Sequence, residues 1–173
     1  MKRFWRDATV DARDGGFAIL LDGRPARTPA RHLLTVPTGT LAEAVAAEWR
    51  EQPEEVDPRT MPLTRLATTV LDLMPARRGD AVEEAAGFAG TDLLCYRAAE
   101  PPELVARQKA AWQPWLDWAL QRHDSLLAVT DTVTAVEQPE ASLRGLRAAV
   151  ERLDDWRLVG VHGAATLTGS VVL

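Results

Sequence analysis

The segment GTDLLCYRA, residues 90–98, brings together side chains that could do chemistry. It contains the only cysteine and the only tyrosine of the chain, Cys95 and Tyr96, with Asp92 before them and Arg97 after them. Cys95 is therefore a candidate nucleophile, and an enzyme that uses it is one functional hypothesis. A cysteine attacks as a thiolate, which requires a nearby base, and no histidine lies close to Cys95 in the sequence.

The neighbours of Cys95 favour a structural interpretation of the same segment. On a helix, the two leucines and Tyr96 would share an apolar side with Cys95 between them, and an unpaired cysteine is among the most buried residue types. Gly90 is typical of a helix end, and Thr91 or Asp92 would then cap the next element. We therefore expect Cys95 to pack in the core, while the enzyme hypothesis stays the alternative.

Composition argues against several other classes of function. The net charge is −5, whereas nucleic-acid binding requires a basic surface, and the one basic cluster (Arg24, Arg27, Arg31 and His32) is interpreted as a solvated hairpin. The phosphate-binding patterns GxxxxGK[ST] and GxGxxG are absent. A single cysteine and three widely spaced histidines offer no metal-ligand spacing. We expect no nucleic acid, no metal, no cofactor and no small-molecule ligand.

The apolar runs of the chain are too short to span a bilayer, and MKRFWRDATV resembles neither a secretory signal nor a transit peptide. These features predict a cytoplasmic protein without membrane insertion. At its other end, the sequence stops within the apolar run of Val171, Val172 and Leu173, which is unusual for an exposed terminus. We therefore expect that a C-terminal part is missing.

The first forty residues have the pattern of short strands. Asp22-Gly23 lies between two extended runs and predicts a hairpin turn, and Pro25 and Pro29 place the second run at a sheet edge. A further short strand should end at Pro37. A helical period then begins, for which Thr40 and a glutamate three residues later have the spacing of a capping box.

Further helices are predicted along the rest of the chain. One begins at Pro62 and ends before Pro75, and the next covers residues 76–89. The apolar face of the former is expected to consist of Leu63, Leu66, Val70 and Leu73 or Met74. A long helix from Pro101 contains Pro114, residues 125–139 should be extended or form a short strand pair, and another helix follows. Trp112, Trp115 and Trp118 recur every third residue, and they either pack in a bundle core or form a partner groove.

The order of these elements predicts an α+β protein. A small N-terminal β-rich α+β domain, residues 1–60, would be followed by a mainly helical orthogonal bundle, residues 61–173. We find no internal repeat.

Several segments, in order along the chain, resemble one known family. They are GGFAILLDGRPARTP, LAEAVAAEW, DPRTMPLTRLATTVLD, GTDLLCYRA, ELVARQKAAWQPWLDW and TLTGSVVL. Together they are similar to the assembly chaperones of the F1 ATP synthase alpha subunit, a family of mitochondria and alphaproteobacteria. The resemblance covers nearly the whole chain.

The resemblance implies a non-catalytic chaperone that binds the unassembled alpha subunit, masks its beta-facing surface and promotes F1 assembly. It also implies a bacterial cytoplasmic location here and the mitochondrial matrix for eukaryotic members, which carry a presequence. Because arginine and tyrosine are frequent at interface centres, we expect Arg59, Asp92, Tyr96 and Arg97 to contact the partner. Asp92 could instead cap a helix and pair with a neighbouring base.

Overall fold

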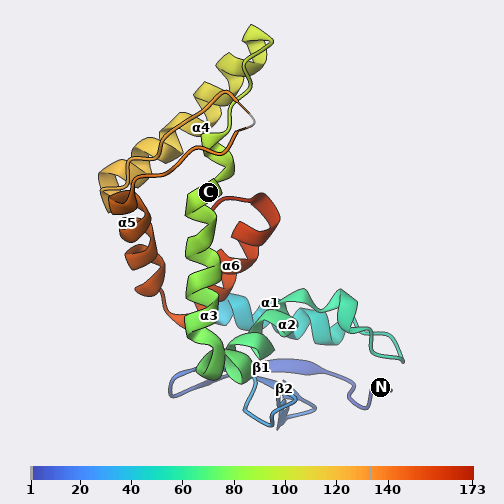
Figure 1. Cartoon of the computed structure of the whole chain (residues 1–173). Coiled ribbons are helices and arrows are strands. Elements are labelled where there is room, and N and C mark those ends of the chain that lie inside the picture. The colour runs from blue at the N-terminus through green and yellow to red at the C-terminus, as the bar shows by residue number, and fades with distance from the viewer. Residues whose placement is uncertain (1, 133) are drawn as a thin grey trace. The chain divides into compact units, whose positions relative to one another are not determined.

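The computed structural model describes residues 2–132 and 134–173, and the chain divides into two compact units, Met1–Arg77 and Arg78–Leu173 (Figure 1). The first unit contains an antiparallel sheet with helices, and the second is mainly helical, so the predicted α+β class is confirmed. The units divide after Arg77, later than the predicted domain boundary at residue 60, and the division into domains at residue 60 stays a prediction.

The sheet of the first unit is built around one central strand. This strand, β2 (Gly16–Leu21), pairs antiparallel with β1 (Ala8–Arg13), with β3 (Arg24–Pro25) and with β4 (Thr35–Val36). The longest pairing is in register from Ala8 opposite Leu21 to Arg13 opposite Gly16.

The predicted hairpin at Asp22-Gly23 is confirmed. Both residues have positive φ values, 49° and 78°, as a tight two-residue hairpin turn requires. The Asp22 carboxylate also accepts hydrogen bonds from the backbone amides of Arg6 and Asp7, at 3.0 Å each. These two hydrogen bonds lower the pKa of Asp22, and the bond from the Asp7 amide has the larger effect. They also hold the chain that precedes β1 against the turn.

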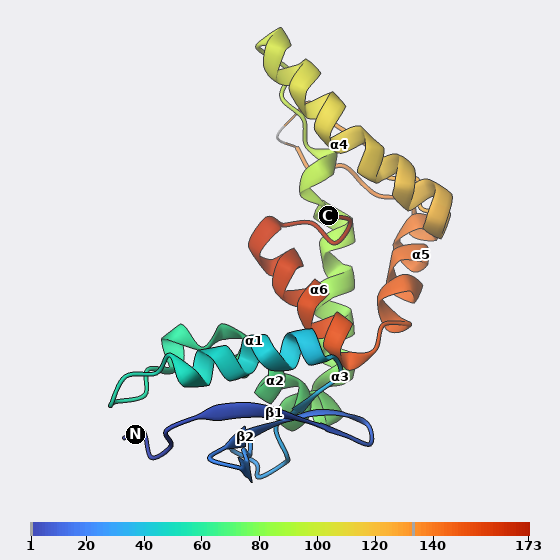
Figure 2. The ribbon, with the colours of Figure 1, turned by 180° about the vertical axis from the view of Figure 1, so that it is seen from behind.

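Helix α1 (Gly39–Arg50) lies over the sheet of the first unit (Figures 1 and 2). Its N-terminal cap is Thr38, whose Oγ1 accepts from the Leu41 amide at 3.3 Å. The prediction that Thr40 caps this helix is therefore wrong, because the helix begins at Gly39 and Thr40 already lies within its first turn. The buried side chains of α1 are Ala42, Val45 and Ala46.

Helix α2 (Pro62–Thr68) begins at Pro62, as predicted. Of the apolar face expected for this run, Val70 and Met74 are buried, but two of the leucines are not. Leu66 and Leu73 are 43% and 50% exposed. The buried positions are Met61, Thr64, Ala67, Val70 and Met74.

Pro75 does not end this helical run, contrary to the prediction. A π turn, Thr69–Leu73, joins α2 directly to α3 (Met74–Gly87), and the amide of Met74 donates to the Thr69 carbonyl. Pro75 therefore lies in the first turn of α3, where a missing N–H is tolerated. The wider turn also changes which side chains face the core, because it adds a residue to the helical repeat.

In the second unit, residues 78–87 of α3 lie between α5 (Glu140–Glu151) and α6 (Asp155–Thr168) in both views (Figures 1 and 2). The predicted long helix is α4 (Pro102–His123), with Pro114 inside it, and it packs on α5. Within the described residues, no helix is both long and apolar enough to cross a membrane. One buried cluster of the second unit consists of Ala89, Leu94, Cys95, Leu116, Ala119, Leu127, Leu146 and Val172.

Two features of the second unit bear on the sequence predictions. The described residues between Ser125 and Pro139 contain no helix and no named strand, and Thr130 forms an isolated parallel bridge with Tyr96 in place of the expected strand pair. Val133, in the same stretch, lies outside the described residues. Helix α6 was not predicted, although Asp154 caps its start and Gly169 ends it in a left-handed conformation, φ 73°.

The start of α2 is held by a side chain of α1, and this contact gives our first prediction. The residue before the helix provides no side-chain cap, and the Glu48 carboxylate of α1 instead accepts from the amides of Leu63 (2.7 Å) and Thr64 (2.8 Å). Glu48→Ala should lower the free energy of unfolding by about 1–2 kcal/mol, because these helix-end donors lose a charged acceptor. Urea denaturation measures this change, and the exposed Glu51→Ala is the matched control. Equal stability of the two variants would contradict the anchor.

Candidate functional site

The carboxylate of Asp92 is completely buried, and it joins two distant parts of the second unit. Its Oδ1 accepts from the Leu94 amide at 3.0 Å, which caps the short helix that follows. Its Oδ2 accepts from the Ser170 hydroxyl and the Val171 amide, both at 2.9 Å, and from the Val172 amide at 3.4 Å. Asp92 is thus a cap, as the sequence allowed, and also a long-range anchor.

Hydrogen bonds of Ser170 and Leu93 also fix the conformation of residues 169–173, the segment that Asp92 contacts. The Ser170 Oγ accepts from the amides of Val172 and Leu173, each at 3.2 Å, and the Leu93 amide donates to the Gly169 carbonyl at 2.9 Å. Val172 is consequently placed in the core. The carboxylate of Asp92 faces the protein's own backbone and not solvent, so we assign it a positioning role.

Cys95 is a core residue, as predicted. Its side chain is completely buried within the apolar cluster of the second unit. Burial, followed by the nearby charge of Asp92, raises the pKa of the Cys95 thiol to about 11, so the thiol keeps its proton at neutral pH. This environment is the opposite of the electropositive, accessible one that activates a nucleophilic cysteine.

Arg97 is half-buried, and its guanidinium group already forms hydrogen bonds and a ring contact within the protein. Its Nε donates to the Leu94 carbonyl at 2.6 Å and its Nη1 to the Gln108 carbonyl at 3.3 Å, and the group lies 5.4 Å from the ring centroid of Trp112. Burial lowers the pKa of Arg97. Among the described residues, its buried Nη2 has no hydrogen-bond partner. Arg97 therefore retains one unused donor beside an aromatic face.

The remaining predicted contact residues, Tyr96 and Arg59, have different surroundings. Tyr96 is partly buried against the core cluster of the second unit. Arg59 belongs to the first unit, where its side chain is 88% exposed and pairs with Asp57 at 2.8 Å. Segment 92–97 thus contains three of the four predicted contact residues, and the partner-binding role of all four stays a prediction.

The tryptophans of α4 differ in exposure. Trp112 is partly buried beneath Arg97, while Trp115 and Trp118 are 47% and 44% exposed. The core interpretation therefore describes Trp112 better than the other two. Leu167, at 88%, is the most exposed of the large apolar side chains described in the second unit.

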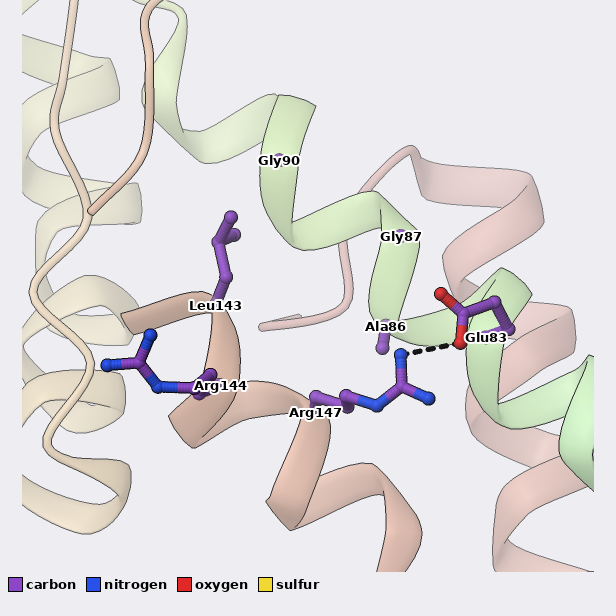
Figure 3. A pocket seen from close by; sticks show the side chains of 7 residues that line it. All are labelled: Glu83, Ala86, Gly87, Gly90, Leu143, Arg144 and Arg147. Carbon is purple, nitrogen blue, oxygen red and sulfur yellow. Dashed lines mark ion pairs between the residues drawn. The ribbon is translucent and has the colours of Figure 1, made fainter. Parts of the chain in front are cut away.

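A groove between α3 and α5 was not foreseen from the sequence. Figure 3 shows the Arg147 side chain extending from α5 to Glu83 on α3, with which it forms an ion pair. Small residues of α3 (Ala86 and Gly87) and of the turn after it (Gly90) line the other side of this groove. Hydrogen bonding to Glu83, and then to Glu151, raises the pKa of Arg147. Among the described residues, no three His, Cys, Asp or Glu side chains are grouped to bind a metal.

Comparisons with known proteins agree with this fold. The family model described as ATP12 chaperone protein matches residues 2–120. The chain belongs to the ATP12 chaperone family.

The similarity extends to solved structures and to a eukaryotic relative. Atp12 from Paracoccus denitrificans is 39% identical with a TM-score of 0.87, and the match covers 99% of this chain and 73% of that one. The Atu1473 protein from Agrobacterium tumefaciens is 38% identical with a TM-score of 0.86, over 99% and 65% of the two chains. The mitochondrial protein atp12 from Schizosaccharomyces pombe is 22% identical over 184 residues. The chain spans 63% of the length of that relative.

The buried carboxylate generates a second prediction. Asp92→Asn keeps the shape but replaces one charged acceptor oxygen by an NH2 group, which cannot accept from surrounding N–H and O–H donors. The free energy of unfolding should fall by about 3 kcal/mol, since hydrogen bonds to a buried charge are strong. Chemical denaturation measures this loss, with the exposed Asp131→Asn as control. A change no larger than that of the control would show that the carboxylate is dispensable for the fold.

Proposed function

We propose that this protein is a non-catalytic chaperone that binds the unassembled alpha subunit of the F1 ATP synthase. It masks the surface that later meets the beta subunit and so promotes F1 assembly, in the bacterial cytoplasm. Membership of the ATP12 chaperone family carries this proposal, and the resemblance of segments such as GTDLLCYRA to the family supplies the alpha subunit as the client.

The surface of the second unit supports a masking role. Trp115, Trp118, Leu126 and Leu167 all leave a large part of their apolar side chains exposed. An unassembled subunit exposes apolar interface that would otherwise aggregate, and a chaperone with exposed apolar groups can cover it reversibly. The beta subunit then competes for the same surface and releases the chaperone.

We further propose that Arg59, Tyr96 and Arg97 contact the client directly. Arg59 offers an exposed guanidinium, although Asp57 already pairs with it. Arg97 is half-buried, and its Nη2 has no hydrogen-bond partner among the described residues. Asp92 contributes indirectly, because its hydrogen bonds place this segment.

Binding of purified alpha subunit to the immobilised chain tests the proposal and is our third prediction. The alpha subunit should bind, and added beta subunit should displace it. Arg97→Ala should weaken binding by the folded fraction more than tenfold, as expected for a hot spot worth about 2 kcal/mol. Its melting temperature should also fall, because the carbonyls of Leu94 and Gln108 lose their donor.

A matched variant separates contact from stability. Asp92→Ala should lower the melting temperature, and the affinity of its folded fraction should stay close to that of the wild type. If Arg97→Ala also lowers only the melting temperature, the segment has a purely structural role. If the alpha subunit does not bind the wild-type chain, the proposed client is wrong.

The buried thiol generates a fourth prediction, which addresses the alternative of a nucleophilic enzyme. Cys95→Ser should still bind the alpha subunit, and its free energy of unfolding should fall by about 1–3 kcal/mol, because a hydroxyl replaces a thiol in the core. Urea denaturation and the binding assay measure the two effects. Wild-type stability combined with abolished function would restore the enzyme hypothesis.

A further inference from the structure

A second pocket lies between α4, α5, α6 and the segment after α6, all in the second unit. Its volume is about 140 Å³. A cavity of about 150 Å³ accommodates a benzene ring, so this pocket has room for one large apolar side chain. The lining residues are Trp118, His123, Leu146, Ala149, Val150, Leu153, Val161 and Val171.

One polar side chain interrupts the apolar wall. The Nδ1 atom of His123 is buried and has no hydrogen-bond partner among the described residues. The imidazole meets Trp118 edge to face, with 4.9 Å between ring centroids and 81° between the planes. Burial, with smaller effects of Arg122 and Arg152, lowers the pKa of His123, so the ring is neutral at pH 7.

Two positive side chains, and the negative Asp124, lie beside this pocket. Arg122 and Arg152 are both exposed, and neither forms an ion pair recorded among the described residues, while Asp124 is exposed beyond the end of α4. The acidic residues next to Arg152 are already paired: Glu151 with Arg147, Asp154 with Arg157, and Asp155 with Arg78. Two guanidinium groups are therefore left to attract carboxylates from a ligand.

We propose that this pocket binds an apolar anchor residue in an acidic segment of the client polypeptide. The apolar side chain enters between α4, α5 and α6 beneath Trp118, and flanking carboxylates pair with Arg122 and Arg152. A half-exposed tryptophan and unpaired arginines around a pocket are the residue types that dominate binding energy at interfaces, and opposite charge speeds association. The identity of the client rests on the proposed function above.

A synthetic peptide tests the pocket independently of the client. The probe is fluorescein-labelled Gly-Glu-Glu-Phe-Glu-Glu-Gly, and fluorescence anisotropy measures its affinity. Ala149→Phe, which fills the pocket, and the double variant Arg122→Glu/Arg152→Glu should each weaken binding at least tenfold. A peptide with lysines in place of the glutamates should not bind the wild-type chain.

The control is a double charge reversal elsewhere on α4, Arg107→Glu/Lys109→Glu. These two exposed residues lie about 20 Å along the helix from Arg122, at about 1.5 Å per residue. This variant should bind the acidic peptide within twofold of the wild type. If this control loses as much peptide affinity as the Arg122/Arg152 variant, the loss is due to net charge alone, and the proposal is overturned. If Ala149→Phe fails to fold, the double variant of Arg122 and Arg152, which changes only exposed side chains, still decides.

The same variants, tested against the alpha subunit, separate this inference from the proposed function. Alpha-subunit binding with no peptide binding would overturn the pocket and leave the proposed function intact. Peptide binding with the expected variant pattern, but no alpha-subunit binding, would support the pocket and overturn the proposed client. Gel filtration adds a further outcome: a dimer that Ala149→Phe dissociates would show that a second copy of the chain fills the pocket, against the proposal.

Discussion

The arrangement of the second unit depends on the need to satisfy one buried charge. A carboxylate removed from water is stable only if donors surround it, and Asp92 receives donors from Leu94 on one side and from residues 170–172 on the other. Because these donors are backbone amides and one hydroxyl, the constraint fixes the path of the main chain. The position of Cys95 in the core and of Val172 beside it follows from that path.

This constraint also explains why a segment with reactive residue types is not arranged for reaction. The carboxylate that might have served as a base is fully used in holding the chain, and the thiol beside it is buried in an apolar cluster. The guanidinium of Arg97 covers Trp112 and bonds to two backbone carbonyls. What remains available to a partner is a rigidly placed surface, which suits recognition better than catalysis.

Local sequence signals predicted local structure correctly, but they did not predict contacts between residues far apart in the sequence. The Asp22-Gly23 turn, the start of α2 at Pro62 and the burial of Cys95 each depend on a few adjacent residues. Val70 and Met74 are buried as expected, whereas the alternative Leu73 is exposed, because the π turn from Thr69 to Leu73 changes the helical repeat there and has no plain sequence signature. Helix α6 was not predicted because its apolar residues form no clear stripe along one face. The pocket near His123 could not be foreseen, since three helices and residue 171 meet there.

The 78-residue separation between Asp92 and Ser170 has a consequence for the order of folding in the cell. Ribosomes add about 5–20 residues per second, so roughly 4–16 s pass between synthesis of these two residues. During that interval the carboxylate stays hydrated, and the helices between the two residues can form without the contact that closes the unit. The second unit is therefore completed only after α4 and α5 have been synthesised, because its last step awaits emergence of residues 170–172 from the exit tunnel.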